Sequence, residues 1–93
     1  MTPSAGAPPP PLRVVLSNPA AHDLRRLDRQ TAERVIAALS RLAESDVGDV
    51  KKLKGQEDRW RLRVGDWRVI FTRDDSGREI IVLAVASRGA AYR

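Results

Sequence analysis

The strongest constraint on the fold is the segment from Arg59 to Arg73, in which two β-type stretches flank the dipeptide Gly65-Asp66. Basic and apolar residues alternate from Arg59 to Val64, which is the period of a half-buried strand. A second β-rich run follows the dipeptide. Gly-Asp is typical of a two-residue hairpin loop. The segment therefore predicts an antiparallel hairpin.

A two-residue loop also sets the register of this hairpin. It places Val64 opposite Trp67, Arg63 opposite Arg68, Leu62 opposite Val69, Arg61 opposite Ile70 and Trp60 opposite Phe71. The apolar partners are then expected on one face, with both tryptophans in the core, and Arg61, Arg63 and Arg68 on the other. Like charges directly opposite each other weaken a sheet. The pattern therefore favours a face that binds an anion over a merely solvated one.

The positive charge of the chain is concentrated in the same region. The 93 residues carry a formal net charge of +5, and residues 51–73 hold eight Lys or Arg against three acidic residues, which accounts for the whole excess. Such a segment favours RNA, DNA or an acidic protein as a partner. Lys51, Lys52 and Lys54 are predicted to lie in a loop and to contact a nucleic-acid backbone.

Length and composition narrow the class of protein. The chain is long enough for one domain with a single core, and the absence of cysteine excludes disulfides and thiolate metal sites. No apolar run approaches the roughly 18 residues of a membrane span, and the N-terminus lacks a signal-peptide pattern. We expect a cytoplasmic protein with no membrane partner. Residues 1–11 hold five of the six prolines and are predicted to be a flexible tail outside the folded domain, residues 12–93.

Two helices are predicted between the tail and the hairpin. Residues 12–16 are predicted to form a strand, after which Asn18 caps a first helix of about two turns and Pro19 opens it. Asp28 is predicted to cap a longer helix. Its apolar positions follow helical spacing and are expected in the core: Ala32, Val35, Ile36, Leu39, Leu42 and Ala43.

The remaining segments complete an α+β domain. Residues 45–57 are predicted to be a loop, residues 74–77 a turn, and residues 80–85 a strand buried on both faces. The helix hairpin is then expected to pack on a small twisted antiparallel sheet of about four strands.

Three parts of the sequence together resemble the RelE/ParE superfamily of toxins from type II toxin-antitoxin systems. They are Leu53-Lys54-Gly55, the run from Trp60 to Phe71, and an apolar strand followed by Arg88 and Tyr92. The resemblance covers residues 12–93 and implies the RelE-like fold. In the RelE branch it implies an mRNA interferase, an endoribonuclease that cuts mRNA in the ribosomal A site. The implied chemistry needs no metal or other cofactor, because the RNA 2′-hydroxyl attacks the adjacent phosphate.

The resemblance also implies the catalytic residues. Arg61 and Arg63 stand where the family commonly has basic residues, Arg68 matches the arginine after the hairpin turn, Arg88 the arginine after the last strand, and Tyr92 the C-terminal tyrosine. Fixed guanidinium groups stabilise charge that builds on a phosphate. The resemblance leaves the identity of the general base open, because this chain has arginine, which stays protonated, where some relatives have lysine. Three roles are open to Tyr92: stacking on a base, orienting the 2′-hydroxyl, or acting as the base.

The partners follow from the same resemblance. It implies the ribosome and mRNA as targets, an acidic cognate antitoxin that shields the arginine face, and a toxin-antitoxin heterotetramer that binds operator DNA through the antitoxin. Two alternatives to the interferase stay open. One is a ParE-like inhibitor of DNA gyrase, and the other is a non-catalytic module whose nucleic-acid affinity falls steeply with salt. The five catalytic candidates together favour the interferase.

Overall fold

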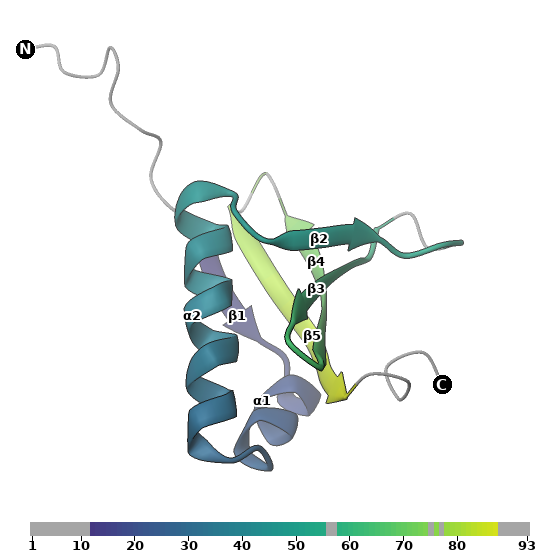
Figure 1. Cartoon of the computed structure of the whole chain (residues 1–93). Coiled ribbons are helices and arrows are strands. Elements are labelled where there is room, and N and C mark those ends of the chain that lie inside the picture. The colour runs from purple at the N-terminus through teal and green to yellow at the C-terminus, as the bar shows by residue number, and fades with distance from the viewer. Residues whose placement is uncertain (1–11, 56–57, 75, 77, 88–93) are drawn as a thin grey trace, which may run out of the picture.

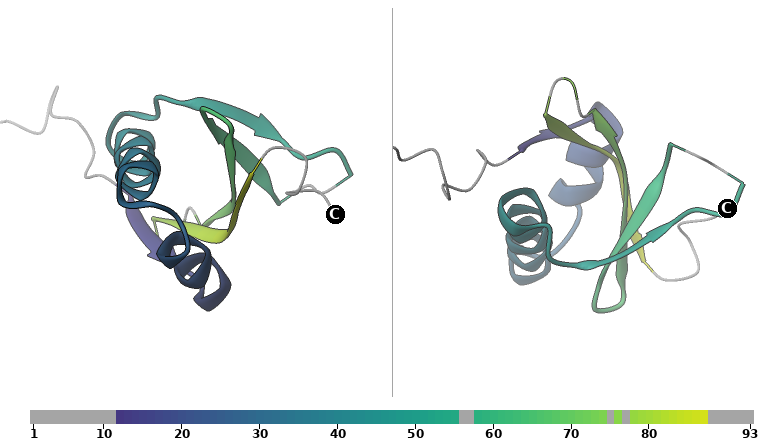
Figure 2. Two further views of the ribbon diagram at one scale, coloured as in Figure 1. Left: turned by 60° about the horizontal axis from the view of Figure 1, so that its bottom comes forward. Right: turned by 90° about the horizontal axis from the view of Figure 1, so that it is seen from above.

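The computed structural model describes residues 12–55, 58–74, 76 and 78–87, so the proline-rich segment predicted to be a tail lies outside the described residues. The elements are β1 (Arg13–Leu16), α1 (Asn18–Arg25), α2 (Arg29–Ser45), β2 (Asp49–Lys52), β3 (Trp60–Val64), β4 (Trp67–Asp74) and β5 (Glu79–Ser87). The strands form one sheet in the order β1-β5-β4-β3-β2. Both helices cover the same side of this curved sheet (Figures 1 and 2). The predicted α+β class is confirmed.

The sheet has five strands instead of about four, and it is mixed. β1 runs parallel to β5, while the other neighbouring strands are antiparallel. The prediction that residues 45–57 form a loop is wrong for β2, which pairs with β3 at the edge of the sheet. Three of its four residues are exposed and charged, with only Val50 half-buried. β2 therefore lacks the apolar pattern by which a buried strand is recognised in a sequence.

The predicted register of the β3–β4 hairpin is confirmed at all of its five pairs. Gly65 in the connecting turn has φ +59°, a left-handed conformation that glycine adopts without steric cost. Leu62, Val69 and Phe71 are buried on the side of the helices. Ile70 is the exception to the expected separation of faces, since it lies opposite Arg61 and is nevertheless only 6% exposed.

Side-chain caps start both helices. α1 begins one residue earlier than predicted: Ser17, not Asn18, is the N-cap, and its hydroxyl accepts a hydrogen bond from the Ala20 amide at 3.2 Å. Asp28 caps α2 as predicted and accepts from the Thr31 amide at 3.1 Å. The Thr31 hydroxyl donates to the same carboxylate, and these bonds hold the pKa of Asp28 below its usual value.

The core lies between the helices and the sheet. α2 contributes Val35, Ala38, Leu39 and Leu42, which pack with α1 and the inward side chains of β3, β4 and β5. The prediction that Ile36 lies in the core is wrong, because it sits beside this stripe and is 52% exposed. Both tryptophans pack against the core as predicted, and the Trp60 ring stacks on Phe71 with centroids 6.2 Å apart. No helix in the described ranges is long and apolar enough to cross a membrane.

Candidate functional site

The sheet surface turned away from the helices, here called the open face, carries the arginines of the hairpin. Residues that pair across neighbouring strands project to the same face of a sheet. Leu62, Val69 and Phe71 belong to the core between sheet and helices, so the residues that alternate with them project the other way. Arg61, Arg63 and Arg68 therefore share the open face, as the sequence predicted.

Strand pairing arranges these side chains in two parallel rows. The first row is Asp49 on β2, Arg63 on β3 and Arg68 on β4. The second row is Lys51 on β2, Arg61 on β3 and Ile70 on β4. Directly opposite side chains have Cβ atoms about 5 Å apart, within the reach of one phosphate group. The two rows thus present four cations and one carboxylate on a surface the width of three strands.

Arg61 differs from the other cations in its burial. Its side chain is 11% exposed, and its terminal nitrogen Nη2 lies 3.5 Å from Oδ1 of Asp49, the diagonal neighbour on β2. The Nε atom of Arg61 is buried and has no hydrogen-bond partner in the described part of the chain. An N–H without an acceptor is costly in a buried place. The guanidinium is therefore held in place by packing and one ion pair, with hydrogen-bonding capacity left over.

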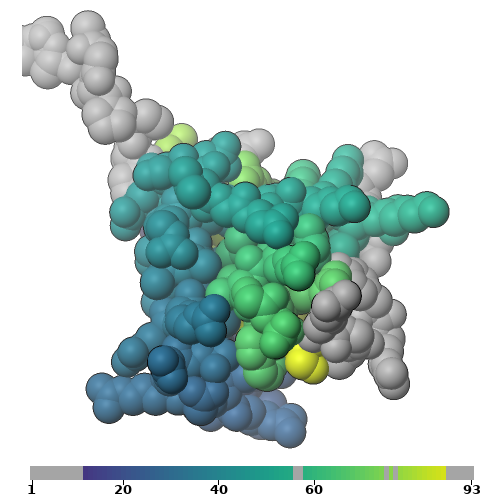
Figure 3. Space-filling model, in the orientation of Figure 1, coloured from purple at the N-terminus to yellow at the C-terminus, as the bar shows by residue number. Residues whose placement is uncertain are grey.

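The three lysines predicted to contact RNA do not lie together. Lys51 projects from the open face beside Arg61, whereas Lys52 projects to the other face, where its Nζ lies 6.0 Å from the centre of the Trp60 ring. Lys54 is exposed in the turn that follows β2. In Figure 3 the end of this β2 segment stands out from the body of the domain. Only Lys51 thus joins the rows of arginines.

Two of the predicted catalytic residues, Arg88 and Tyr92, lie outside the described residues. Asp49, which no sequence pattern singled out, lies at the end of the first row. Its alternation with Lys51 around Val50 is the signal that could have placed both side chains on one face, if residues 49–52 had been recognised as a strand.

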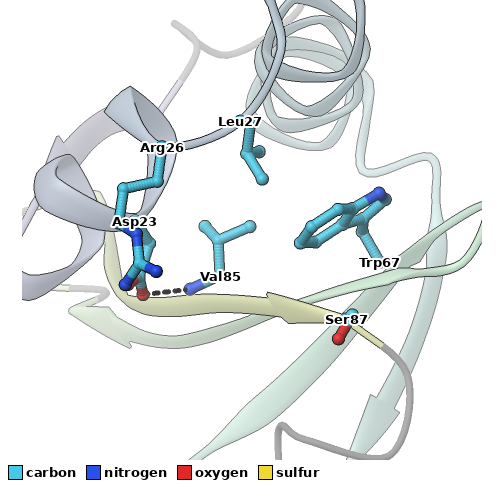
Figure 4. Close-up of a pocket in the computed structure, with 6 residues that line it drawn as sticks. All are labelled: Asp23, Arg26, Leu27, Trp67, Val85 and Ser87. Atoms are coloured by element: carbon cyan, nitrogen blue, oxygen red, sulfur yellow. Dashed lines mark hydrogen bonds between the residues drawn. The ribbon is translucent and has the colours of Figure 1, made fainter.

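A separate cavity of about 350 Å³ lies on the helix side of the sheet, lined by Asp23, Arg26, Leu27, Trp67, Val85 and Ser87 (Figure 4). The Asp23 carboxylate in this lining is engaged within the fold, because its Oδ2 accepts a hydrogen bond from the Val85 amide at 2.9 Å. None of the open-face arginines lines this cavity. The cavity and the cationic rows are therefore separate features of the domain.

Comparison with known proteins identifies the family. The sequence profile of the ParE toxin family, toxins of type II toxin-antitoxin systems (parDE), matches residues 14–92. The chain belongs to this family. It is accordingly a type II toxin of the RelE/ParE superfamily, as the sequence resemblance implied. A search of curated protein sequences finds no match to this toxin.

Solved structures of RelE toxins share the fold of this ParE-family toxin. A RelE–RelB complex from the archaeon Pyrococcus horikoshii matches with a TM-score of 0.73 and 28% identity, over 88% of this chain and all of the other. A RelBE2 toxin-antitoxin complex from Mycobacterium tuberculosis matches with a TM-score of 0.75 and 23% identity, over 85% of this chain and 100% of the other. The isolated Escherichia coli RelE toxin matches with a TM-score of 0.71 and 17% identity, over 87% and 88% of the two chains. The fold is therefore RelE-like.

Proposed function

We propose that this toxin is an mRNA interferase, a ribosome-dependent endoribonuclease that stops translation. The observation that carries the proposal is the convergence of Arg61, Arg63 and Arg68 on the open face. Arg63 and Arg68 lie directly opposite each other, and a phosphodiester bound between them would be attracted by both guanidinium groups. A face built in this way fits a phosphate at the centre of a reaction better than it fits solvent.

Cleavage by the neighbouring 2′-hydroxyl builds negative charge on the phosphate oxygens, and guanidinium groups fixed in advance stabilise that charge in the transition state. Arg61 fits this role because its side chain is nearly buried and already paired with Asp49. The guanidinium groups of Arg61, Arg63 and Arg68 supply donors in the planar geometry that phosphate oxygens accept. Arg88 and Tyr92 remain proposed catalytic residues on the sequence resemblance alone.

The toxin is proposed to contact RNA, the ribosome and an antitoxin through residues beyond those at the reacting phosphate. The exposed Lys51, Lys52 and Lys54 are proposed to contact RNA or ribosomal phosphates, which add affinity without sequence preference. A type II toxin has a cognate antitoxin, and the similar Mycobacterium and Pyrococcus structures are RelE complexes with RelB. For this chain we propose an acidic antitoxin that covers the open face, a heterotetramer that binds operator DNA through the antitoxin, and action on ribosomes in the cytoplasm.

The test is to induce the chain alone in a bacterial host and to map the 5′ ends of cellular mRNAs within minutes. We expect cuts inside translated regions, in register with the reading frame. Arg68→Ala should abolish them and should slow cleavage by the purified protein by about 10²–10³-fold, the usual effect of removing one transition-state donor. Arg29→Ala is the matched control, because Arg29 is an exposed α2 residue that pairs with Glu33. A folded Arg68→Ala protein that still cuts mRNA would refute the proposed site.

The second candidate function is inhibition of DNA gyrase, the activity of the ParE branch. The observation that favours it is the match to the profile named for ParE toxins. The same induction experiment separates the two functions. Growth arrest with intact mRNA and a rising DNA-damage response would assign the toxin to the gyrase inhibitors.

A further inference from the structure

We propose that two side chains of β2, Asp49 and Lys51, are the proton acceptor and proton donor of RNA cleavage on the open face. This inference rests on the proposed interferase function and names the groups that exchange protons in it. Neither residue belongs to the arginine set that the sequence resemblance points to. Both enter the site only because the structure turns residues 49–52 into a strand.

Strand pairing places the two groups next to the arginines of β3, both on the β2 side of them. Asp49 lies directly opposite Arg63, and Lys51 directly opposite Arg61. Asp49 and Lys51 are two residues apart on one strand, so they share a face and stand roughly 7 Å from each other along it. The carboxylate of Asp49 lies within 3.5 Å of the Arg61 guanidinium, and its side chain is 60% exposed. Both groups are thus accessible next to the donors that would hold the phosphate.

The arginines cannot exchange protons in this reaction. A guanidinium stays protonated in proteins, so it can stabilise charge but cannot accept a proton from the 2′-hydroxyl or supply one to a leaving oxygen. Within the two rows, the carboxylate of Asp49 and the amine of Lys51 are the groups that can gain and lose a proton. Lys52 projects from the opposite face of β2, over the Trp60 ring, so it does not face a phosphate bound on the open face.

The reaction balances with these two groups alone. The carboxylate of Asp49 takes the 2′-hydroxyl proton while the oxygen lone pair forms the new bond to phosphorus. The bond between phosphorus and the 5′-oxygen breaks, and its electron pair stays on that oxygen, which takes a proton from the Lys51 ammonium. The products are a 2′,3′-cyclic phosphate and a 5′-hydroxyl, and water exchange restores both side chains. In-line displacement needs acceptor and donor on opposite sides of the phosphorus, and a phosphate bound between Asp49 and Lys51 along β2 would have one group on each side.

The experiment measures single-turnover cleavage of a short mRNA on programmed ribosomes by the full-length protein. Two substrates are compared, the natural RNA and an RNA in which sulfur replaces the bridging 5′-oxygen at the cut. A thiolate leaves without a proton, so a missing donor no longer matters on the second RNA. The variants are Asp49→Asn, which cannot accept the proton, and Lys51→Arg, which keeps the charge but cannot release one. Glu33→Gln, an exposed α2 acid that pairs with Arg29, is the matched control.

We expect both variants to cut the natural RNA about 10²–10⁴-fold more slowly than the wild type, the usual effect of losing a general acid or base. On the sulfur RNA, Lys51→Arg should approach the wild-type rate, whereas Asp49→Asn should stay slow and Glu33→Gln should match the wild type throughout. Lys51→Arg that stays equally slow on both RNAs, or Asp49→Asn that cuts at the wild-type rate, would overturn the assignment. If the wild type leaves both RNAs intact, the interferase function itself is wrong.

Discussion

Replacing Asp23 with alanine should destabilise the domain through one defined hydrogen bond. β1 ends at Leu16, opposite Val82, so no strand of the described residues neighbours this edge of β5 beyond that point. α1 covers this stretch: Oδ2 of Asp23 accepts from the Val85 amide at 2.9 Å. Val85 is only 4% exposed, so removing the carboxylate takes the acceptor away from a largely buried amide.

The expected magnitude follows from that geometry. A hydrogen bond to a charged group contributes about 1.5–3 kcal/mol, and removing one partner of a buried pair costs a similar amount. Asp23→Ala should therefore lower the free energy of unfolding by about 2 kcal/mol. At about 4–8 °C per kcal/mol for a domain of this size, the melting temperature should fall by roughly 8–16 °C. Asp23→Asn keeps an oxygen acceptor without the charge, and should lose about half as much.

Urea unfolding followed by tryptophan fluorescence measures the loss, and amide exchange by NMR locates it. The Val85 amide should exchange faster in Asp23→Ala, in excess of what global destabilisation causes. Glu33→Ala serves as the control, since Glu33 is an exposed helix residue with one surface ion pair. An Asp23→Ala protein within about 0.5 kcal/mol of the wild type, or unchanged exchange at Val85, would refute this account of the β5 edge.

Two further predictions concern the hairpin turn and a helix cap. Gly65→Ala should cost about 1–2 kcal/mol in urea unfolding, because φ is +59° and the new Cβ would lie 3.1 Å from Nη2 of Arg34; an unchanged midpoint would contradict it. The lowered pKa of Asp28 means that its cap stabilises the fold fully above its ordinary value of 3.8, and that this contribution disappears as the pH falls through the lower folded value. Asp28→Ala should flatten the pH dependence of the urea midpoint below pH 3.8, and parallel curves for both proteins would contradict this.

The hairpin is an example of a structure that residues close together in the sequence are enough to predict. A two-residue turn and strict alternation are local properties, so the register from Trp60 to Phe71 could be predicted pair by pair. The grouping of Arg61, Arg63 and Arg68 on one face follows directly from that register. The N-cap of α2 at Asp28 could be predicted equally well, because an N-cap depends only on the capping residue and the three residues after it.

Structural features that depend on segments far apart in the chain could not be predicted from the sequence. Ile36 fits the helical spacing as well as Leu39 does, yet it lies beside the buried stripe of α2 and is 52% exposed. β1 pairs in parallel with β5, although the two strands are more than 60 residues apart in the sequence. Such pairings need long loop closures that leave no pattern in either segment alone.

The sequence by itself determined the β3–β4 hairpin, the two helices and the arginine-lined face, because each rests on interactions among residues a few positions apart. The tertiary structure decided that β2 is a strand at all, that Asp49 and Lys51 stand opposite Arg63 and Arg61, and that Arg61 is nearly buried. A short, charged edge strand has little preference for β structure of its own. It acquires that structure, and its place beside the arginines, from the hydrogen bonds that β3 offers it.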